Sequence, residues 1–254
     1  MSNQNKFRHI VNLAVIGIFI FSTAFACNKS AQVPKVHPKV LVFSKTAAFH
    51  HSSIALSVPA IQKLGVENKF DVDTTTDAQK FTATNLKQYA AVIFLNTSGN
   101  VLNDDQQQAF ESYIRSGGGF VGVHAAADTE YDWPWYGNLV GAYFKNHPFQ
   151  QQVATLNIVD QKHISTQHLP AKWERKDEWY NFKSITEGLH VLITIDESTY
   201  NGGENGENHP MSWYHDYDGG RAFYTALGHT DESYAEPLYL QHLLGGIKYA
   251  IDKK

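Results

Sequence analysis

Cysteine is almost absent from this sequence, since Cys27 is the only one among 254 residues. It lies at the end of an N-terminal apolar segment, so the rest of the chain contains no thiol. Disulfide bonds, zinc–thiolate sites and cysteine nucleophiles are therefore excluded for residues 28–254. Any chemistry of the main domain must proceed without a thiol.

A strong excess of charge is also missing, because the net charge is only -4. No basic patch appears that could replace the counterions of a phosphate backbone, so we expect no nucleic-acid partner. The phosphate-loop pattern G-x-x-x-x-G-K-[ST] is absent, and the glycines of residues 117–122 precede a strand instead of following one. We therefore expect no nucleotide cofactor. The absence of a G-x-S-x-G turn argues against a Ser-His-Asp hydrolase.

A long apolar run occurs at the N-terminus, over residues 10–26, after the basic residues Lys6 and Arg8. Small residues, Ala24 and Ala26, precede Cys27. This order is typical of a signal peptide, which we assign to residues 1–26. The run is too short and too interrupted for a comfortable membrane span.

Cys27 stands where bacterial lipoprotein signals place the residue that is lipidated. The segment resembles a lipobox, although Ala24 occupies a position where leucine is commoner. We expect cleavage to leave Cys27 as an acylated N-terminus that holds the protein on a membrane, periplasmic or cell-surface. Residues 27–38, polar with two prolines, are then a flexible tether, and residues 39–254 form one domain. The alternative is plain secretion with a spare thiol.

Strands and helices alternate through the first half of this domain. Buried strands are predicted at 40–43, 70–73, 90–95 and 120–123, with helices over 53–64 and from Asn103 to Gly117, and a short helical turn at 85–88. This pattern predicts an α/β fold: a doubly wound, mostly parallel sheet with helices on both faces. After Asp128 we predict a helix at 137–144, strands at 153–158, 191–195, 211–214 and 221–225, and a final helix at 236–251.

Histidines follow several of the predicted strands. His124 ends the strand at 120–123, His229 follows Gly228, and His50 and His51 follow the first strand. Ligands collect at the carboxyl ends of strands in open α/β sheets, where these imidazoles would converge. Neutral imidazoles suit zinc and similar divalent metals. The alternative is that each histidine is bonded to nearby backbone, and no pair has the i, i+4 spacing of a helical zinc motif.

Two carboxylates stand beside two rings in the run Asp177, Glu178, Trp179 and Tyr180. A carboxylate near an aromatic wall loses hydration, which raises its pKa toward values useful for general acid–base catalysis. An extended chain sends Asp177 and Glu178 to opposite sides, so at most one faces a given pocket. The alternative is a solvated acidic turn. Aromatic rings in polar surroundings can stack on sugars, or they can instead plug loops onto the core.

The motifs together resemble the ThuA (trehalose utilisation) family over about residues 39–251. They are His51-Ser52-Ser53-Ile54, the run from Gly119 to Asp128, His147-Pro148, Asp177 to Tyr180, and Gly220-Arg221 through Gly228-His229. The resemblance implies a flavodoxin-like fold related to class I glutamine amidotransferases. Those relatives carry a cysteine at the turn where this chain has His124, so amidotransferase chemistry is not expected.

The resemblance also implies a role in sugar metabolism, especially of trehalose and keto-sugars. His51, His124, Glu178, Tyr180 and His229 match positions that line the family's pocket, whereas His50 stands where the family often has arginine.

Two functions follow from these assignments, and a small carbohydrate is the expected partner in both. The first is an enzyme, a metal-assisted hydrolase, lyase or isomerase, in which His51, His124 and His229 hold a divalent metal or polarise a carbonyl. Glu178 would move a proton and Tyr180 would orient the substrate, with His124 contributing to catalysis. The second is a non-catalytic carbohydrate-binding lipoprotein. The residues predicted to contact the sugar are His50, Asp128, His147, Trp179 and Trp213.

Overall fold

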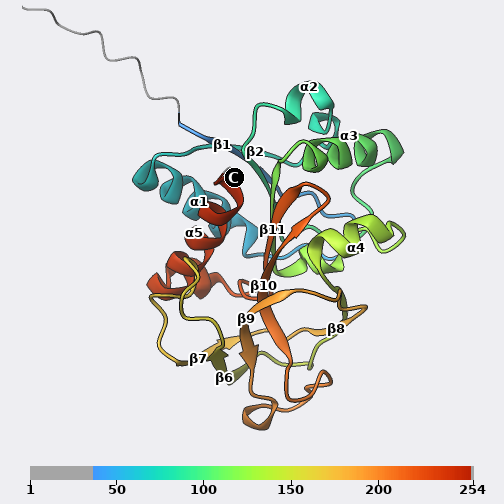
Figure 1. The fold of residues 1–254 in the computed structure, drawn as a ribbon. Helices are drawn as coiled ribbons and strands as arrows, with labels where there is room; N and C mark the ends of the chain where they lie inside the picture. Colours follow the sequence, from blue (N-terminus) through green and yellow to red (C-terminus); the bar gives the residue numbers. More distant parts are fainter. Residues whose placement is uncertain (1–36, 253–254) are drawn as a thin grey trace, which may run out of the picture. The chain divides into compact units, whose positions relative to one another are not determined.

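The computed structural model describes residues 37–252. Nine strands form one sheet in the order β2-β1-β3-β4-β11-β10-β9-β6-β7 (Figure 1). The strands are β1 (Lys39–Phe43), β2 (Asp71–Thr75), β3 (Ala91–Leu95), β4 (Gly119–Val123), β6 (Gln152–Ile158), β7 (Lys172–Asp177), β9 (His190–Ile195), β10 (Pro210–Tyr217) and β11 (Gly220–Thr225). A small second sheet pairs β5 (Tyr143–Asn146) with β8 (Asn181–Lys183).

Helices lie on both sides of the main sheet, with α1 and α5 on one side of Figure 1 and α3 and α4 on the other. They are α1 (Ile54–Asn68), α2 (Ala83–Leu86), α3 (Asp104–Arg115), α4 (Pro134–Val140) and α5 (Pro237–Ile251), joined by the short 3-10 turns η1 (Ala78–Lys80), η2 (His124–Asp128), η3 (Glu197–Thr199) and η4 (Asp231–Ala235). Within the described range, no helix combines the length and apolarity that a membrane span requires.

The predicted α/β fold is confirmed. Five strands, β2, β1, β3, β4 and β11, run parallel to one another in the order of a flavodoxin-like sheet. Antiparallel pairing then adds β10, β9, β6 and β7 beyond β11. The carboxyl ends of β1, β3, β4 and β11 therefore meet at one edge of the sheet.

The core lies on both faces of the central strands. Every residue of β3 and β4 is buried, as their continuous apolar runs predict for a sheet covered on both sides. Phe94 packs against Phe43, Phe110 and Phe120 with ring centroids 5.3 to 5.5 Å apart. These contacts fix the strands whose ends carry the functional side chains.

The predicted helix at 137–144 is wrong in its position. Helix α4 begins at Pro134, whose fixed φ favours the first helical turn, and it ends at Val140. Gly141 then adopts a left-handed φ of 94°, and residues 143–146 form β5 instead. The sequence prediction extended a helix through a glycine that ends it.

Three predicted features of the N-terminus lie outside the described residues. They are the signal peptide at 1–26, Cys27, and residues 27–36 of the tether.

A buried histidine of α5 should make the protein unstable in acid. His242 is fully buried, with Nδ1 2.9 Å from the carbonyl oxygen of Ser165 and Nε2 3.2 Å from Oγ1 of Thr225. Burial lowers the pKa of His242 to about 3. Below pH about 6.5 the unfolded chain takes up a proton at this residue and the folded chain does not, so stability falls as the pH falls from 6.5 toward 3.

The expected loss from His242 alone is about 1.4 kcal/mol per pH unit. Urea unfolding at pH 7 and pH 5 should therefore show a free-energy loss about 2 kcal/mol smaller for His242→Gln than for the unmodified chain. Gln241→Asn, at the exposed neighbouring position of α5, is the control and should keep the pH dependence of the parent chain. Equal pH dependence of His242→Gln and the parent chain would contradict this role.

Candidate functional site

Four side chains from distant segments meet at the carboxyl edge of the parallel strands. His51, His124, Glu178 and His229 each place a ligand atom within 4.8 Å of the others. His51 follows β1, His124 ends β4, Glu178 follows β7 and His229 follows β11. These four residues are called the His-Glu centre below.

His124 is fixed by a backbone hydrogen bond that sets its tautomer. The residue is fully buried and has a left-handed φ of 47° at the end of β4. Its Nδ1 lies 2.7 Å from the carbonyl oxygen of Ala226, which can only accept, so we assign the proton to Nδ1. In the neutral ring, Nε2 then directs a lone pair toward the His-Glu centre, the arrangement that ligating histidines use.

The polar atoms of the centre carry too few protons for the close contacts between them. Oε2 of Glu178 is 3.2 Å from Nε2 of His124 and 3.1 Å from Nδ1 of His229, and these two nitrogens are 3.2 Å apart. With neutral rings and an ionised carboxylate, His229 is the one residue that can place a proton inside this triangle. Additionally, Nδ1 of His51 is buried without a hydrogen-bond partner. A cation among these atoms would satisfy all four residues.

The pKa shifts keep Glu178 ionised and His51 neutral. Burial alone would raise the pKa of Glu178, but the neighbouring imidazoles of His124 and His229 together outweigh it and lower that pKa. The predicted rise in the pKa of Glu178 is therefore wrong, because the neighbouring imidazoles act more strongly than the aromatic wall.

The pKa values of His51 and His229 shift in opposite directions. Burial, assisted by His124 and His229, lowers the pKa of His51 to about 2, so this ring is neutral at physiological pH. Burial also opposes charge on His229, but its hydrogen bond with Glu178 is stronger and raises its pKa. Metal binding requires neutral imidazoles and an ionised carboxylate, so the shifts of His51 and Glu178 suit a cation, whereas His229 would have to give up the proton that Glu178 stabilises.

Asp177 holds the loop that carries His229. This buried carboxylate accepts hydrogen bonds from the backbone N–H groups of Gly228 at 3.0 Å and His229 at 3.2 Å, and Nη2 of buried Arg175 lies 3.0 Å away. Gly228 has a φ of 105°, and a Cβ there would lie 2.2 Å from the hydroxyl of Tyr239, so the turn requires glycine. The end of β7 thus provides Asp177, which positions the loop of His229, and Glu178, which belongs to the His-Glu centre.

An aromatic wall closes one side of the His-Glu centre. The ring of Tyr180 lies 4.2 Å from that of His124 and 4.3 Å from that of Phe144, and burial raises its pKa far above 10. His147 is partly exposed, with Nδ1 3.4 Å from Oε1 of Glu178. Tyr180 therefore shapes the wall, and His147 lies closer to solvent.

Asp128 provides a second carboxylate near the centre. It ends η2, and its Oδ1 accepts a hydrogen bond from the hydroxyl of Tyr131 at 2.7 Å. Burial raises the pKa of Asp128, opposed in part by Tyr131 and by the charges of His124 and His147. The predicted rim residue His50 is exposed, with Nδ1 3.2 Å from Oγ1 of Thr46.

Trp179 and Trp213 belong to the core and not to a binding surface. Each is 1% exposed. The indole N–H of Trp179 donates to the carbonyl of Gln152, and that of Trp213 to the carbonyl of Val140, both at 2.8 Å. Their assignment to sugar binding is therefore corrected: the sequence placed them in polar surroundings, but long-range packing covers them.

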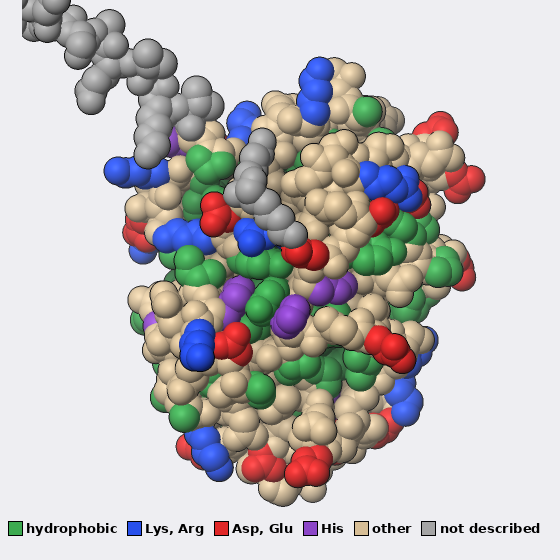
Figure 2. Space-filling model, viewed as in Figure 1, with side chains coloured by type: hydrophobic (Ala, Val, Ile, Leu, Met, Phe, Trp, Pro, Cys, Tyr) green, Lys and Arg blue, Asp and Glu red, His purple; other side chains and the backbone are tan. Residues whose placement is uncertain are grey.

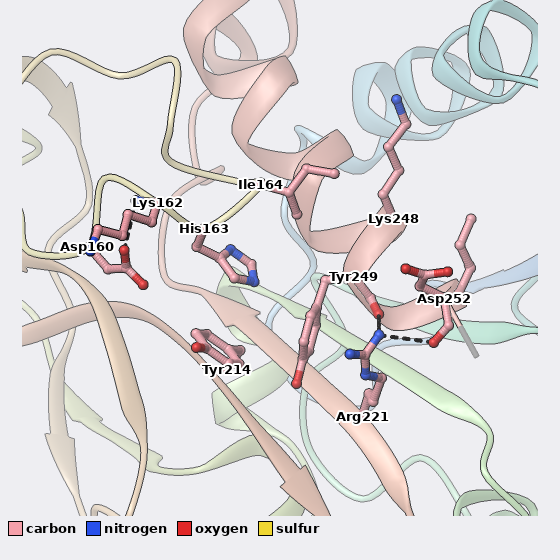
Figure 3. Close-up of a pocket in the computed structure, with 10 residues that line it drawn as sticks. Asp160, Lys162, His163, Ile164, Tyr214, Arg221, Lys248, Tyr249 and Asp252 are labelled. Atoms are coloured by element: carbon pink, nitrogen blue, oxygen red, sulfur yellow. Dashed lines mark hydrogen bonds between the residues drawn. The ribbon is translucent and has the colours of Figure 1, made fainter. Parts of the chain in front are cut away.

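A groove of about 650 Å³ lies elsewhere, beside the carboxyl end of α5 and the amino end of β11 (Figure 3). Its Arg221 donates to the backbone carbonyls of Tyr249 and Asp252, and the rings of His163 and Tyr214 stack at 4.5 Å. These groups contact one another, although Nε2 of His163 and Nε of Arg221 are buried without a hydrogen-bond partner. Charged side chains of both signs are interspersed across the face in Figure 2.

Comparisons with known proteins agree with this fold. The family model described as ThuA, trehalose utilisation, matches residues 39–250. A putative ThuA-like protein from Bacteroides uniformis is 26% identical with a TM-score of 0.73, covering 87% of this chain and 94% of that one. A putative ThuA-like protein from Parabacteroides merdae is 22% identical with a TM-score of 0.68, covering 84% and 90%.

A likeness of fold alone extends to the β-galactosidase of Bacillus circulans. It is 14% identical with a TM-score of 0.55, and the match covers 83% of this chain but 30% of the enzyme. A search among curated proteins finds no match.

Proposed function

Because the chain belongs to the ThuA family, described as trehalose utilisation, we propose that it is an exported lipoprotein enzyme acting on a sugar or keto-sugar at a metal-binding His-Glu centre. The observation that carries this proposal is the convergence of His51, His124, Glu178 and His229 within 4.8 Å. Export and anchoring through Cys27 rest on the signal-like sequence of residues 1–27.

The donor set of the centre fits a divalent metal of the zinc type. Three imidazoles and one carboxylate are ordinary zinc ligands. Nδ1 of His51 has no hydrogen-bond partner, and Oε2 of Glu178 lies close to two imidazole nitrogens with too few protons between them; both observations support a cation there. When bound, such an ion polarises a carbonyl or lowers the pKa of a water molecule. Groups that orient the four residues are also present, because the carbonyl of Ala226 orients His124 and Asp177 orients the His229 loop.

This arrangement changes the role of Glu178 from proton carrier to ligand. Its pKa is lowered, so it remains ionised and is a poor acid. Asp128 has the opposite shift, since burial raises its pKa. When two carboxylates of one site have pKa values shifted in opposite directions, they commonly take different roles, one remaining ionised and the other exchanging a proton. Asp128, held by Tyr131, is therefore the residue that moves a proton on the substrate, and Tyr180 shapes the wall against which the substrate lies.

Metal analysis together with product analysis tests this proposal. The full chain should contain about one divalent ion per polypeptide and should convert trehalose or an oxidised disaccharide, as measured by NMR of the products. Chelation should remove both the ion and turnover, and zinc should restore them. Protein that binds these sugars without turnover would favour the non-catalytic alternative. Protein with neither metal nor turnover would contradict the proposal.

A further inference from the structure

An apolar ring stands exposed directly beside the His-Glu centre. Phe49 is 63% exposed, and its ring meets that of His51 at 4.8 Å and an interplanar angle of 81°. His51 in turn lies edge to face with His124 at 4.9 Å and His229 at 5.1 Å. Phe49 therefore lies between the histidine cluster and solvent, in contact with His51.

The backbone holds Phe49 in this exposed position. Oγ of Ser98 donates to the carbonyl of Phe49 at 2.7 Å, and the N–H of Ala47 donates to the carbonyl of Ser98 at 2.7 Å. Gly99 has a φ of 70°, and a Cβ there would lie 3.2 Å from the amide nitrogen of Ala48. The two loops thus pack closely, which fixes the backbone at Phe49, and the ring itself remains exposed against His51. Single exposed apolar side chains are common on protein surfaces, but this ring contacts a residue of the His-Glu centre, and that position points to a ligand.

The surroundings of Phe49 match the chemistry of a pyranose. The centre offers imidazoles and a carboxylate to ligand oxygens, whereas Phe49 offers an apolar face. A pyranose has both kinds of surface, hydroxyl groups at its edge and C–H groups on its faces. The buried rings of Trp179 and Trp213 cannot supply this contact.

We propose that Phe49 is a specificity-determining residue, a platform on which a pyranose ring stacks while one of its oxygens faces the His-Glu centre. This inference rests on the proposed function and names the part of the site that selects cyclic sugars. Acyclic polyols carry the same hydroxyl groups but lack a flat C–H face, so the site should discriminate against them.

Calorimetry on the full chain with trehalose, methyl α-D-glucopyranoside and sorbitol tests this inference. Phe49→Ala should weaken binding of both cyclic sugars by about tenfold or more, and Phe49→Trp should retain it. Phe149→Ala is the matched control, because Phe149 is 98% exposed and follows His147 by two positions. Its effect should be no more than about twofold. Zinc affinity should be the same in all these variants.

The outcomes separate this inference from the proposed function. Wild-type binding of cyclic sugars that Phe49→Ala leaves unchanged would overturn the platform alone. Binding of sorbitol as tightly as the cyclic sugars would also overturn it. A wild-type chain that binds zinc but none of the cyclic sugars or their oxidised forms would overturn both the platform and the sugar-active function.

Discussion

Replacing His124 with asparagine is expected to abolish turnover and to weaken zinc binding by at least about 100-fold, because four ligands share a binding free energy on the order of 10–16 kcal/mol. Asparagine tolerates the left-handed φ of 47° at this position, and its amide can still donate to the carbonyl of Ala226. It is too short to place a second donor atom in the His-Glu centre. The variant should therefore fold and lose the ligand.

Competition calorimetry with zinc measures this effect, and thermal unfolding of the metal-free protein checks the fold. His215→Asn is the matched control, since His215 is also buried and bonds a backbone carbonyl, that of Leu139, at 2.9 Å. It lies in β10, outside the centre. If zinc affinity falls equally in the two variants, the loss reflects general destabilisation and His124 is not a ligand.

Replacing Asp128 with asparagine should have the second-largest effect, a loss of about 100- to 10,000-fold in kcat. Asparagine can still accept the hydrogen bond from Tyr131, but it cannot exchange a proton. Zinc affinity should stay unchanged, because Asp128 lies outside the four-residue centre. Glu178→Gln, in contrast, should lose both zinc affinity and turnover.

Steady-state kinetics and zinc titration of the same samples separate these two carboxylates. Asp132→Asn is the control for Asp128→Asn, since Asp132 is exposed and lies four positions further along the chain. Turnover by Asp128→Asn at the wild-type rate would assign the proton transfer to another group. Zinc loss in Asp128→Asn would instead make Asp128 a ligand.

The parallel half of the fold and the edge that carries the site follow from local sequence patterns. The apolar runs of β3 and β4 have no polar face, and glycines occur directly before β4 and shortly after β11. These patterns placed His124 and His229 at strand ends, and the parallel order β1-β3-β4-β11 then brings those ends together.

The remaining features depend on contacts between distant segments. Strand β7, KWERKD, buries Arg175 and Asp177 as a pair. Its buried positions therefore include charged residues, and the usual alternation of apolar and polar residues that predicts a strand is missing. The sign of the pKa shift at Glu178 was unpredictable for the same reason, since it is set by His124 and His229. Whether an aromatic ring lines the core or the site, as with Trp213 and Phe49, is also decided by tertiary packing.

Zinc K-edge X-ray absorption on the full chain tests most directly whether His51, His124, Glu178 and His229 bind one ion. We predict three imidazole nitrogens at about 2.0–2.1 Å and one carboxylate oxygen at about 2.0–2.2 Å. In His124→Asn the same spectrum should lose one imidazole. A zinc signal without imidazole, one unchanged by His124→Asn, or no zinc bound to the purified chain after zinc is supplied would contradict the metal centre.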